Sequence, residues 1–484
     1  MIIQKNTKVI QDTVHGNIIV DGDIVKYLID SPYFQRLRHI EQSSIRALFP
    51  TARHDRFVHS LGVFHIGDLI ASNIEQNGIE DINNKDLIAI TKSYRIACLL
   101  HDIAHAPFSH TFEKYYGSET ELYNRLRGNL EIEEELQPTQ IKDIKQHEWG
   151  SALLIINSDL NTIIRDVFHG DIEFICRMIV GWKYPEEEII NQIKNCFIEL
   201  LHGDIIDADR IDYACRDVWA SGYSTATVNV QRLVKAIHIR KNPADKYVVC
   251  YSTNALSDVD NVLSVRLFQN KNVLTHHTIV YEQLLMIYAA EDMARKKFPD
   301  IQKKEDALAK IITLDAIIDH NKVDDYDFNY LCDDDLFFLM KQDKHNPYFE
   351  ELSRRKYTRF ALWKNLSEFY HLFPSVPKDV DILKSSIKEK VSKALEPIVD
   401  KSKLIFEEVE LKAPKNLDSM WVVVNGIVKE YKDICPNFIV NPKDNNGVKF
   451  TYIYVPLREE EQQHQAYKNA IIETLSPIMQ ELFG

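Results

Sequence analysis

The chain is constrained most by residues 99–110, LLHDIAHAPFSH, where an apolar run ends in the adjacent pair His101 and Asp102. An imidazole nitrogen and a carboxylate oxygen side by side offer two ligands to a divalent metal ion. Two ligands do not close a metal site. The fold therefore has to bring further ligands to this pair from segments that are distant in the sequence.

Two other segments carry side chains that suit this purpose. Residues 52–74 and 85–106 have apolar residues at helical spacing, and the first of these predicted helices carries His59. Residues 200–222 place carboxylates on a largely apolar predicted helix, where each needs a partner because an unpaired buried charge is costly. The sequence predicts a site for one metal ion on three helices, with His59, His101, Asp102 and either Asp207 or Asp209 as ligands.

The predicted ligands are two imidazoles and two carboxylates. This set suits a divalent ion such as Mn, Fe, Ni, Zn or Mg, and the residue types do not select among them. We expect one ion per subunit. A single histidine on an apolar helix, taken alone, is more often a hydrogen-bonded residue of the core than a ligand.

The remaining sequence predicts a mainly α fold with a short N-terminal β-hairpin and a smaller α+β C-terminal region. β-branched residues around a His-Gly turn predict the hairpin in residues 9–20, and Ser31 followed by Pro32 predicts a helix start. Strand-like runs occur at residues 404–411, 420–424 and 449–455.

A chain of 484 residues exceeds what one hydrophobic core usually serves, so we expect two domains. The predicted domains are residues 1–300 and 301–484, with the boundary between 300 and 345. Residues 119–145 are rich in Glu, Lys and Gln, and we expect them to form an exposed insertion.

Net charge, cysteine content and the lack of long apolar runs limit the kinds of partner and the cellular compartment that we expect. The 58 basic and 72 acidic residues give a net charge of −14, which argues against nucleic acid as a partner but allows a local basic pocket. The seven cysteines form no CxxC pair and are expected to be reduced thiols. The first ten residues have no apolar leader, and no run approaches the ~20 apolar residues of a membrane span. These features predict a cytoplasmic protein without a membrane partner.

Three segments carry a family resemblance, in this order: HDRFVHSLG, LLHDIAHAPFSH and DIIDADRIDYACRD. They resemble the HD-domain superfamily, and within it the deoxynucleoside triphosphate triphosphohydrolases. The segments VIQDTVHGNI, SPYFQRLRHIEQ and RRKYTRF are similar to the branch that includes the animal sterile-alpha-motif and HD-domain-containing enzyme and its bacterial relatives. The resemblance is strong over residues 8–290 and implies an HD-domain helical core in residues 1–300.

The resemblance implies a role for the polar residues of these motifs. The implied metal ligands are His59, His101, Asp102 and Asp209, and Asp209 replaces Asp207 as the choice because it matches the family's Asp-x-Asp pattern. The implied contacts of the triphosphate are Arg56 and Arg210, whose guanidinium groups suit phosphate oxygens. The implied phosphate-binding or proton-donating side chains are His105, His110 and His147, with Glu148 to orient one of them.

The resemblance also implies residues for the sugar and base and for a regulatory nucleotide. The implied substrate contacts are Gln42, Tyr213, Asp217 and Arg266. The implied regulatory residues are Lys8, Asp30, Gln35 and Arg38. The chain departs from the animal enzyme at Ser43 and at Leu274, which stands where that enzyme has a tyrosine against the sugar.

Several of these residues have simpler interpretations. Arg56 could cap a helix, His105 could buttress His101, and Tyr213 could be a core aromatic residue. Asp30 could likewise be a helix cap and Arg38 a surface charge.

The function implied by the resemblance is metal-dependent hydrolysis of a nucleoside or deoxynucleoside triphosphate. The products would be nucleoside and tripolyphosphate, with His110 or His147 protonating the leaving 5′ oxygen. The family further implies a homo-oligomer, a dimer or tetramer, that a nucleotide activator switches. One alternative is an HD phosphodiesterase or nuclease acting on cyclic nucleotides or single-stranded nucleic acid. Another is a nucleotide-sensing scaffold that binds without turnover.

Overall fold

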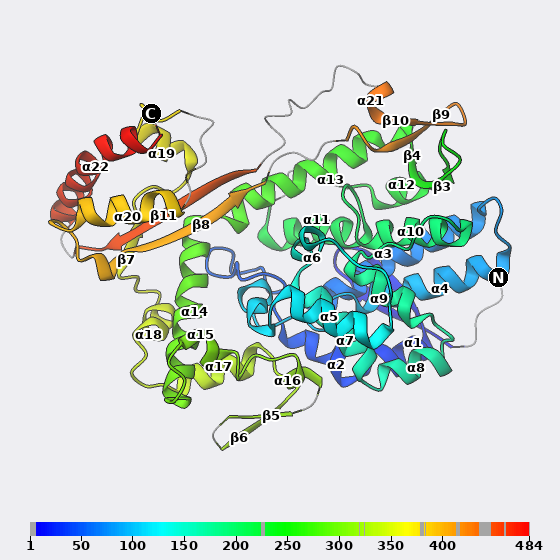
Figure 1. Ribbon diagram of the computed structural model, residues 1–484, viewed down its shortest axis with the longest axis horizontal. Helices are drawn as coiled ribbons and strands as arrows, with labels where there is room; N and C mark the ends of the chain where they lie inside the picture. Colours follow the sequence, from blue (N-terminus) through cyan, green and yellow to red (C-terminus); the bar gives the residue numbers. More distant parts are fainter. Residues whose placement is uncertain are drawn as a thin grey trace. The chain divides into compact units, whose positions relative to one another are not determined.

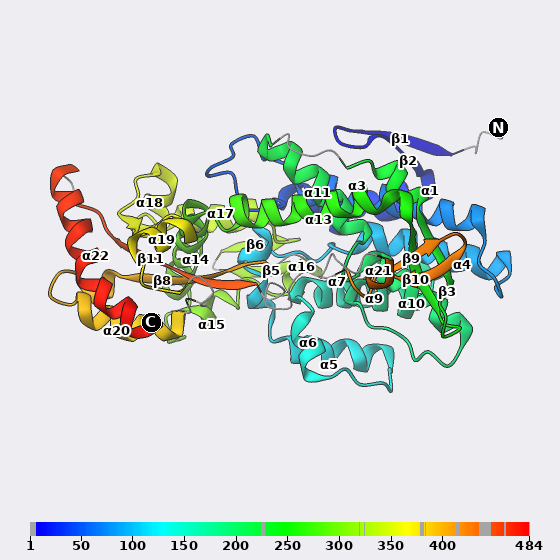
Figure 2. The same cartoon turned by 90° about the horizontal axis from the view of Figure 1, so that it is seen from above.

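A computed structural model describes residues 6–223, 228–318, 320–323, 325–377, 382, 384–412, 417–434, 447–458 and 461–483 (Figures 1 and 2). These residues are mainly helical, with small sheets, which confirms the predicted fold class. Within the described residues, no helix is both long enough and apolar enough to cross a bilayer.

The chain forms two compact units, each built from three separate segments. The first contains Met1–Val265, Ala290–Lys344 and Leu417–Ile439, and the second contains Arg266–Ala289, His345–Asn416 and Val440–Gly484. The expected division into residues 1–300 and 301–484 stays a prediction about domains that fold independently.

The first unit begins with the predicted hairpin. Strand β1 (Thr7–Asp12) pairs antiparallel with β2 (Gly16–Asp21), and Asp12 lies opposite Gly16. The tight turn between them contains His15 and needs a left-handed residue, which Gly16 supplies with φ +75°. The helix predicted at Pro32 is α2 (Pro32–Gln35), whose first turn is capped by the Ser31 hydroxyl.

Helix α3 (Arg56–Asn77) is capped by Asp55, and α4 (Asn84–Leu100) is capped by Asn83. The predicted helix over residues 85–106 ends six residues early, because the chain turns at residues 101–104 and Pro107 disfavours helix before it. Phe108 and Ser109 then take left-handed backbone angles. The shorter helix leaves His101 at its end and Asp102 in the turn that follows.

A bundle of helices packs around α3 and α4. Helix α11 (Ala208–Ser221) packs on α3, α9 (Ile172–Val180) packs on α4, and α7 (Gln146–Asn157) packs on α9. Helix α10 (Ile189–Leu201) contacts α9, α4 and α11. Figures 1 and 2 show these helices side by side. The bundle brings together the three predicted ligand-bearing segments.

Residues 119–145 form α5 (Glu119–Leu130) and α6 (Pro138–Asp143), and most of them are exposed, as the sequence predicts. Leu122, Tyr123 and Leu126 are buried on one face of α5. The Tyr123 ring lies 5.8 Å from that of Trp149 and 5.4 Å from that of Trp182, measured between centroids. Polar composition concealed a narrow apolar stripe at helical spacing, which is enough to dock a helix on α7.

A four-stranded sheet completes the core of the first unit, in the order β10-β9-β4-β3. Strands β3 (Ile237–Lys241) and β4 (Tyr247–Ser252) form a hairpin. Strand β9 (Trp421–Val424) pairs parallel with β4 and antiparallel with β10 (Ile427–Glu430). The predicted strand at residues 420–424 therefore belongs to the first unit.

The other elements of the first unit are short: α1 (Gly22–Ile24), α8 (Leu160–Asp166), α12 (Val230–Lys235), α15 (Lys304–Leu308), α16 (Asp315–Ile318), β5 (His320–Val323), β6 (Tyr326–Asn329), α17 (Asp333–Gln342) and α21 (Tyr431–Ile434). Helices α13 (Leu256–Gln269) and α14 (His277–Lys297) contribute residues to both units.

The second unit is built on a three-stranded antiparallel sheet in the order β7-β11-β8. Its core contains Trp363, Phe369, Phe450 and Ile453. The strands are β7 (Arg359–Ala361), β8 (Ile405–Leu411) and β11 (Val448–Pro456), and the helices are α18 (Pro347–Arg354), α19 (Leu366–Leu372), α20 (Lys384–Leu395) and α22 (Glu461–Phe483). The strands predicted at residues 404–411 and 449–455 are confirmed.

Candidate metal centre

Three helices of the first unit converge on one small volume. His59 lies on α3, His101 ends α4, and Asp209 lies in the first turn of α11. One ligand atom from each of these residues lies within 4.8 Å of the others. The His59 Nε2 atom is 2.9 Å from the Asp209 Oδ1 atom, and the His101 Nε2 atom is 3.8 Å from it.

The carboxylate of Asp102 faces the same volume. Its Oδ2 atom lies 3.6 Å from His59 Nε2 and 3.5 Å from His101 Nε2. The same Oδ2 atom accepts a hydrogen bond of 2.6 Å from Arg56. Burial raises the pKa of Asp102, but His101 and Arg56 outweigh it and hold this pKa well below its usual value. Asp102 is therefore an anion inside the protein.

The arrangement fits a divalent cation. The Nε2 atoms of His59 and His101 are buried and make no hydrogen bond of acceptable geometry within the described part of the chain. Each Nδ1 atom is engaged, because that of His59 lies 2.7 Å from Asp212 Oδ2 and that of His101 lies 3.0 Å from the Cys98 carbonyl oxygen. A histidine whose Nδ1–H donates in this way presents a free Nε2 lone pair to a metal.

Asp207 and Asp209 were both candidates from the residues alone, and the structure gives them different surroundings. Asp207 caps α11 by accepting from the Arg210 backbone, and its other oxygen accepts from the Gly203 N–H and pairs with the Arg210 guanidinium at 2.9 Å. Burial raises the pKa of Asp207, whereas that of Asp209 is lowered because His59 outweighs burial. Asp209 is the aspartate of this pair that faces the two histidines.

Three further histidines lie on the other side of Asp102. The His105 and His147 rings stack with centroids 4.1 Å apart, and the His110 ring meets both at 4.9 and 5.3 Å. His147 Nε2 lies 3.7 Å and His105 Nε2 lies 3.9 Å from Asp102 Oδ1. These three rings, which the sequence predicts as site histidines, form a second group close enough to share a ligand.

Glu113 is a member of this cluster that sequence reasoning missed. It follows the short 3-10 turn Ser109–Thr111, and its two oxygens contact His147 Nδ1 at 2.5 Å and His110 Nδ1 at 3.1 Å. Burial raises the pKa of Glu113, but the two histidines outweigh burial and lower it. Glu113 and the other acidic neighbours in turn raise the pKa of His147 against the effect of burial. The spacing of Glu113 three residues after His110 was the available signal.

A cavity of about 90 Å³ opens beside these groups. Its lining includes predicted residues from both parts of the cluster: His101, Asp102, His147, Glu148, Asp209 and Arg210. It also includes His202, which the sequence did not single out. Glu148 Oε1 lies 3.1 Å from His202 Nε2, and although burial lowers the pKa of His202, this carboxylate raises it to about 9. Glu148 thus contacts His202 and caps α7 at the Lys145 N–H, 2.6 Å away.

Arg56, predicted to contact the triphosphate, is 4% exposed. Besides Asp102 it donates to the Ser109 hydroxyl at 3.0 Å and to the Gln42 carbonyl at 2.9 Å. Arg210 is less buried and lines the cavity. The two arginines therefore flank the cluster in different ways, and their contact with substrate stays a prediction.

The predicted sugar and base contacts are dispersed. The Gln42 side chain is buried, and its Oε1 atom has no hydrogen-bond partner among the described residues. Asp217 pairs with His54 Nε2 at 2.7 Å, and Tyr213 lies half-buried on α11. Arg266 belongs to the second unit.

The predicted regulatory residues lie near the N-terminus. Gln35 donates to the Ile29 carbonyl at 2.8 Å and accepts from Arg38 at 2.9 Å. Arg38 also covers the Phe57 ring. Lys8 is exposed on β1, and Asp30 is exposed where the π-helical turn Val25–Ile29 ends.

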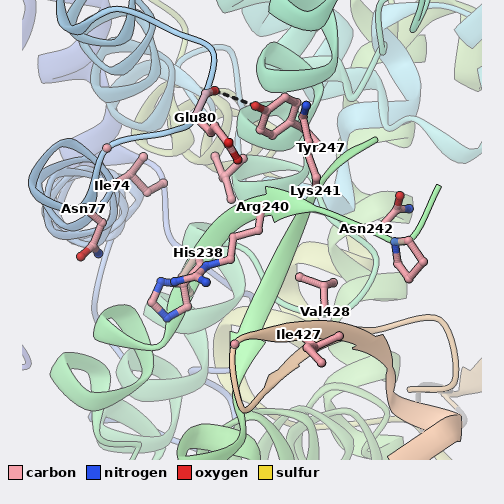
Figure 3. A pocket seen from close by; sticks show the side chains of 15 residues that line it. Ile74, Asn77, Glu80, His238, Arg240, Lys241, Asn242, Tyr247, Ile427 and Val428 are labelled. Carbon is pink, nitrogen blue, oxygen red and sulfur yellow. Dashed lines mark hydrogen bonds between the residues drawn. The ribbon is translucent and has the colours of Figure 1, made fainter. Parts of the chain in front are cut away.

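A cavity of about 610 Å³ lies elsewhere in the first unit, along β3 (Figure 3). It is lined by the end of α3, by β3 and by the β9–β10 turn, with apolar side chains such as Ile74 and Ile427 and polar ones such as His238, Arg240 and Lys241. The Tyr247 hydroxyl donates to the Glu80 carbonyl at 2.6 Å at its edge. No predicted site residue is among the described residues that line it.

Comparison with known proteins agrees with this geometry. Residues 56–214 match the family model described as HD domain. These residues form an HD domain. The HD domain contains His59, His101, Asp102 and Asp209, together with the histidine group around Glu113.

The chain is 29% identical over 277 residues to the deoxynucleoside triphosphate triphosphohydrolase SAMHD1 homologue of Dictyostelium discoideum, covering 56% of this chain and 47% of that protein. Human SAMHD1 is 32% identical over 238 residues, covering 43% of this chain and 33% of that protein. The chain thus spans about half the length of the first relative and a third of the second.

A crystal structure of a hypothetical protein from Aquifex aeolicus superposes with a TM-score of 0.62 at 22% identity, over 96% of this chain and 99% of that chain. This similarity shows a shared fold. The HD domain supports a metal-dependent hydrolase.

Proposed function

We propose that the protein hydrolyses nucleoside or deoxynucleoside triphosphates to nucleoside and tripolyphosphate with one divalent metal ion per subunit. The observation that carries this proposal is the convergence of buried His59 Nε2 and His101 Nε2 on Asp209, with the Asp102 anion beside them. The names of the SAMHD1 relatives support the choice of substrate class.

His59, His101, Asp102 and Asp209 would hold the ion. When bound, the metal supplies Lewis-acid stabilisation of phosphate oxygens and an acidified water. The chain's own contribution is to fix charged groups around a small cavity before substrate arrives. Arg56 keeps Asp102 ionised and fixed in position, because it donates directly to the Oδ2 atom that faces both histidines.

The histidine group around Glu113 suits the phosphates and the leaving group. Glu113 accepts from His147 Nδ1 and His110 Nδ1, which leaves their Nε2 atoms for phosphate oxygens or for proton transfer. Water adds its oxygen to the α-phosphorus and loses one proton to the solvent, the bond from phosphorus to O5′ breaks, and the nucleoside leaves with a proton on O5′. His147 or His110 supplies that proton from Nε2.

The remaining assignments concern specificity and regulation. Arg56 and Arg210 would contact the triphosphate, and Gln42, Tyr213, Asp217 and Arg266 the sugar and base. A nucleotide activator would bind at Lys8, Asp30, Gln35 and Arg38 in a homo-oligomer, a dimer or tetramer. The name of the Dictyostelium relative, a deoxynucleoside triphosphate triphosphohydrolase, supports the substrate contacts, and the regulatory assignments rest on the motif resemblance alone.

Product analysis tests the proposal. The metal-free protein is loaded with Mn, Fe, Ni, Zn or Mg and incubated with each ribo- and deoxyribonucleoside triphosphate. We expect nucleoside and tripolyphosphate in equal amounts, with no product from the metal-free protein. Release of monophosphate and pyrophosphate, or the absence of turnover with every metal, would contradict it. Cleavage of labelled single-stranded DNA under the same conditions would favour a nuclease.

A further inference from the structure

We infer that Asp212, held by His15 from the tip of the N-terminal hairpin, is the positioning residue that fixes His59 for metal binding. This inference rests on the metal site of the proposed function and extends it to side chains that do not face the metal. Asp212 lies on α11, one turn after Asp209, and its side chain is fully buried.

Each oxygen of the Asp212 carboxylate has two hydrogen-bonding partners. Its Oδ2 atom accepts from His59 Nδ1 at 2.7 Å and from Arg216 Nε at 2.9 Å. Its Oδ1 atom contacts His15 Nε2 at 2.6 Å and accepts from Arg216 Nη2 at 3.0 Å. An ionised carboxylate only accepts hydrogen bonds, so the proton of the His59 contact is on Nδ1. In the neutral ring, which is the form that binds a metal, the lone pair of His59 is then on Nε2, which faces Asp209.

Arg216 keeps Asp212 in this state. Its fork binds both carboxylate oxygens, and its third nitrogen, Nη1, reaches Asp12 Oδ2 at 2.8 Å. Asp12 in turn accepts from the backbone N–H of His15 at 2.7 Å, which fixes the hairpin turn. The His15 side chain is 4% exposed although the residue lies in a hairpin turn. The hairpin is thereby attached to the metal site through buried hydrogen bonds.

The sequence of α3 makes room for this attachment. Gly62 lies one turn after His59, and a Cβ atom there would collide with the Asp212 carboxylate and with Arg216 Nη2. A larger residue at position 62 would push α11 away from α3. The glycine in the His59-Ser60-Leu61-Gly62 segment is therefore required for the close approach of a carboxylate to the ligand helix.

General coordination chemistry gives this contact its expected size. Metal-bound histidines commonly donate their other N–H to a carboxylate, which fixes ring orientation and tautomer, and losing that partner costs roughly 10- to 100-fold in metal affinity or activity. His15 contacts Asp212 and not His59, so it acts on the metal ligand only through Asp212. Its loss should have the smaller effect, because Arg216 still holds Asp212.

Titration of the full-length, metal-stripped protein with Co²⁺ tests the inference, read by dissociation constant and by visible absorption of the bound ion. We expect Asp212→Asn to weaken binding roughly 10- to 100-fold and to change the Co²⁺ spectrum. His15→Ala should weaken binding less, and His15→Gln, which restores a donor, should recover affinity. The matched control is Arg95→Met on α4, which removes the two ion pairs of Arg95 with Asp68 and Glu75 on α3, away from the cluster.

The outcomes separate the two claims. Absence of Co²⁺ binding by the wild type would overturn the proposed function and this inference with it. Binding by the wild type, with unchanged affinity and spectrum in folded Asp212→Asn and His15→Ala, would overturn the inference alone. Equal losses in Arg95→Met and His15→Ala would show general destabilisation and also overturn it. If Asp212→Asn does not fold, the two His15 variants decide.

Discussion

The metal cluster and the cavity beside β3 differ in size and in the side chains that line them, and we place the proposed reaction at the smaller one. The cluster cavity is about 90 Å³ and the β3 cavity about 610 Å³. Around the first, buried imidazoles and carboxylates face one another, and His59 and His101 keep Nε2 atoms without hydrogen bonds among the described residues. Around the second, apolar side chains such as Ile74 and Ile427 alternate with polar and charged ones, among them His238, Arg240 and Lys241. Buried metal-ligating atoms that converge on one point indicate a reactive site better than volume does.

The largest expected effect comes from removing a metal ligand. Asp209→Ala takes away the carboxylate nearest His59 Nε2, so both metal content and hydrolysis should fall by more than about 100-fold, beyond the loss expected for outer partners. Metal analysis after gel filtration and steady-state kinetics measure the two quantities. Full activity and full metal content in this variant would contradict the assignment of the metal site to the smaller cavity.

A smaller loss is expected from Glu113→Gln. Glutamine has one acceptor oxygen, so it cannot accept from His147 Nδ1 and His110 Nδ1 together as the carboxylate does. We expect kcat to fall about tenfold or more, as for a misplaced proton donor, while metal content stays at the wild-type level. Loss of metal in this variant would instead show that the histidine group around Glu113 helps to hold the ion.

The Glu148–His202 pair should affect stability in a pH-dependent way. Glu148 raises the pKa of His202 from 6.5 to about 9 in the folded protein, so its stabilisation is complete below pH 6.5 and is lost as the pH rises through about 9. The pKa of Glu148 is lowered from its usual value of 4.5 in the folded protein. The stabilisation by ionised Glu148 is therefore complete above pH 4.5 and is lost as the pH falls below that value. Glu148→Gln should therefore cost about 1 kcal/mol of unfolding free energy near pH 6.

Denaturant unfolding at pH 6 and pH 9.5 measures this difference for Glu148→Gln against wild type. A cost that is equal at the two pH values would show that the charge on His202 does not stabilise the fold.

The smallest effect is expected at the other cavity. Arg240→Ala changes an exposed side chain on β3 that makes no part of the cluster, so kcat, KM and metal content should match the wild type. The same kinetic assay checks this. A tenfold fall in activity would mean that the β3 cavity takes part in the reaction.

The sequence predicted the fold where a local pattern determines it. The hairpin followed from its His-Gly turn, the start of α2 from Ser31 and Pro32, and the ligand-bearing helices from apolar spacing. The family motifs selected Asp209 rather than Asp207, and in the structure Asp209 faces the histidines.

Other features depend on tertiary approach and could not be predicted in this way. The docking of α5 depends on Trp149 and Trp182, which are distant in sequence. The pairing of Glu148 with His202 and of His15 with Asp212 joins segments whose spacing carries no signal. Gly62 was visible in the sequence, but its meaning appears only when α11 lies against α3.

The most direct test of the account is the position of the metal. A crystal of the protein grown with Mn²⁺ and measured for anomalous scattering should show one peak bonded to His59 Nε2, His101 Nε2, Asp102 and Asp209. A peak among His105, His110 and His147 instead, or no peak in the HD domain, would contradict the central claim.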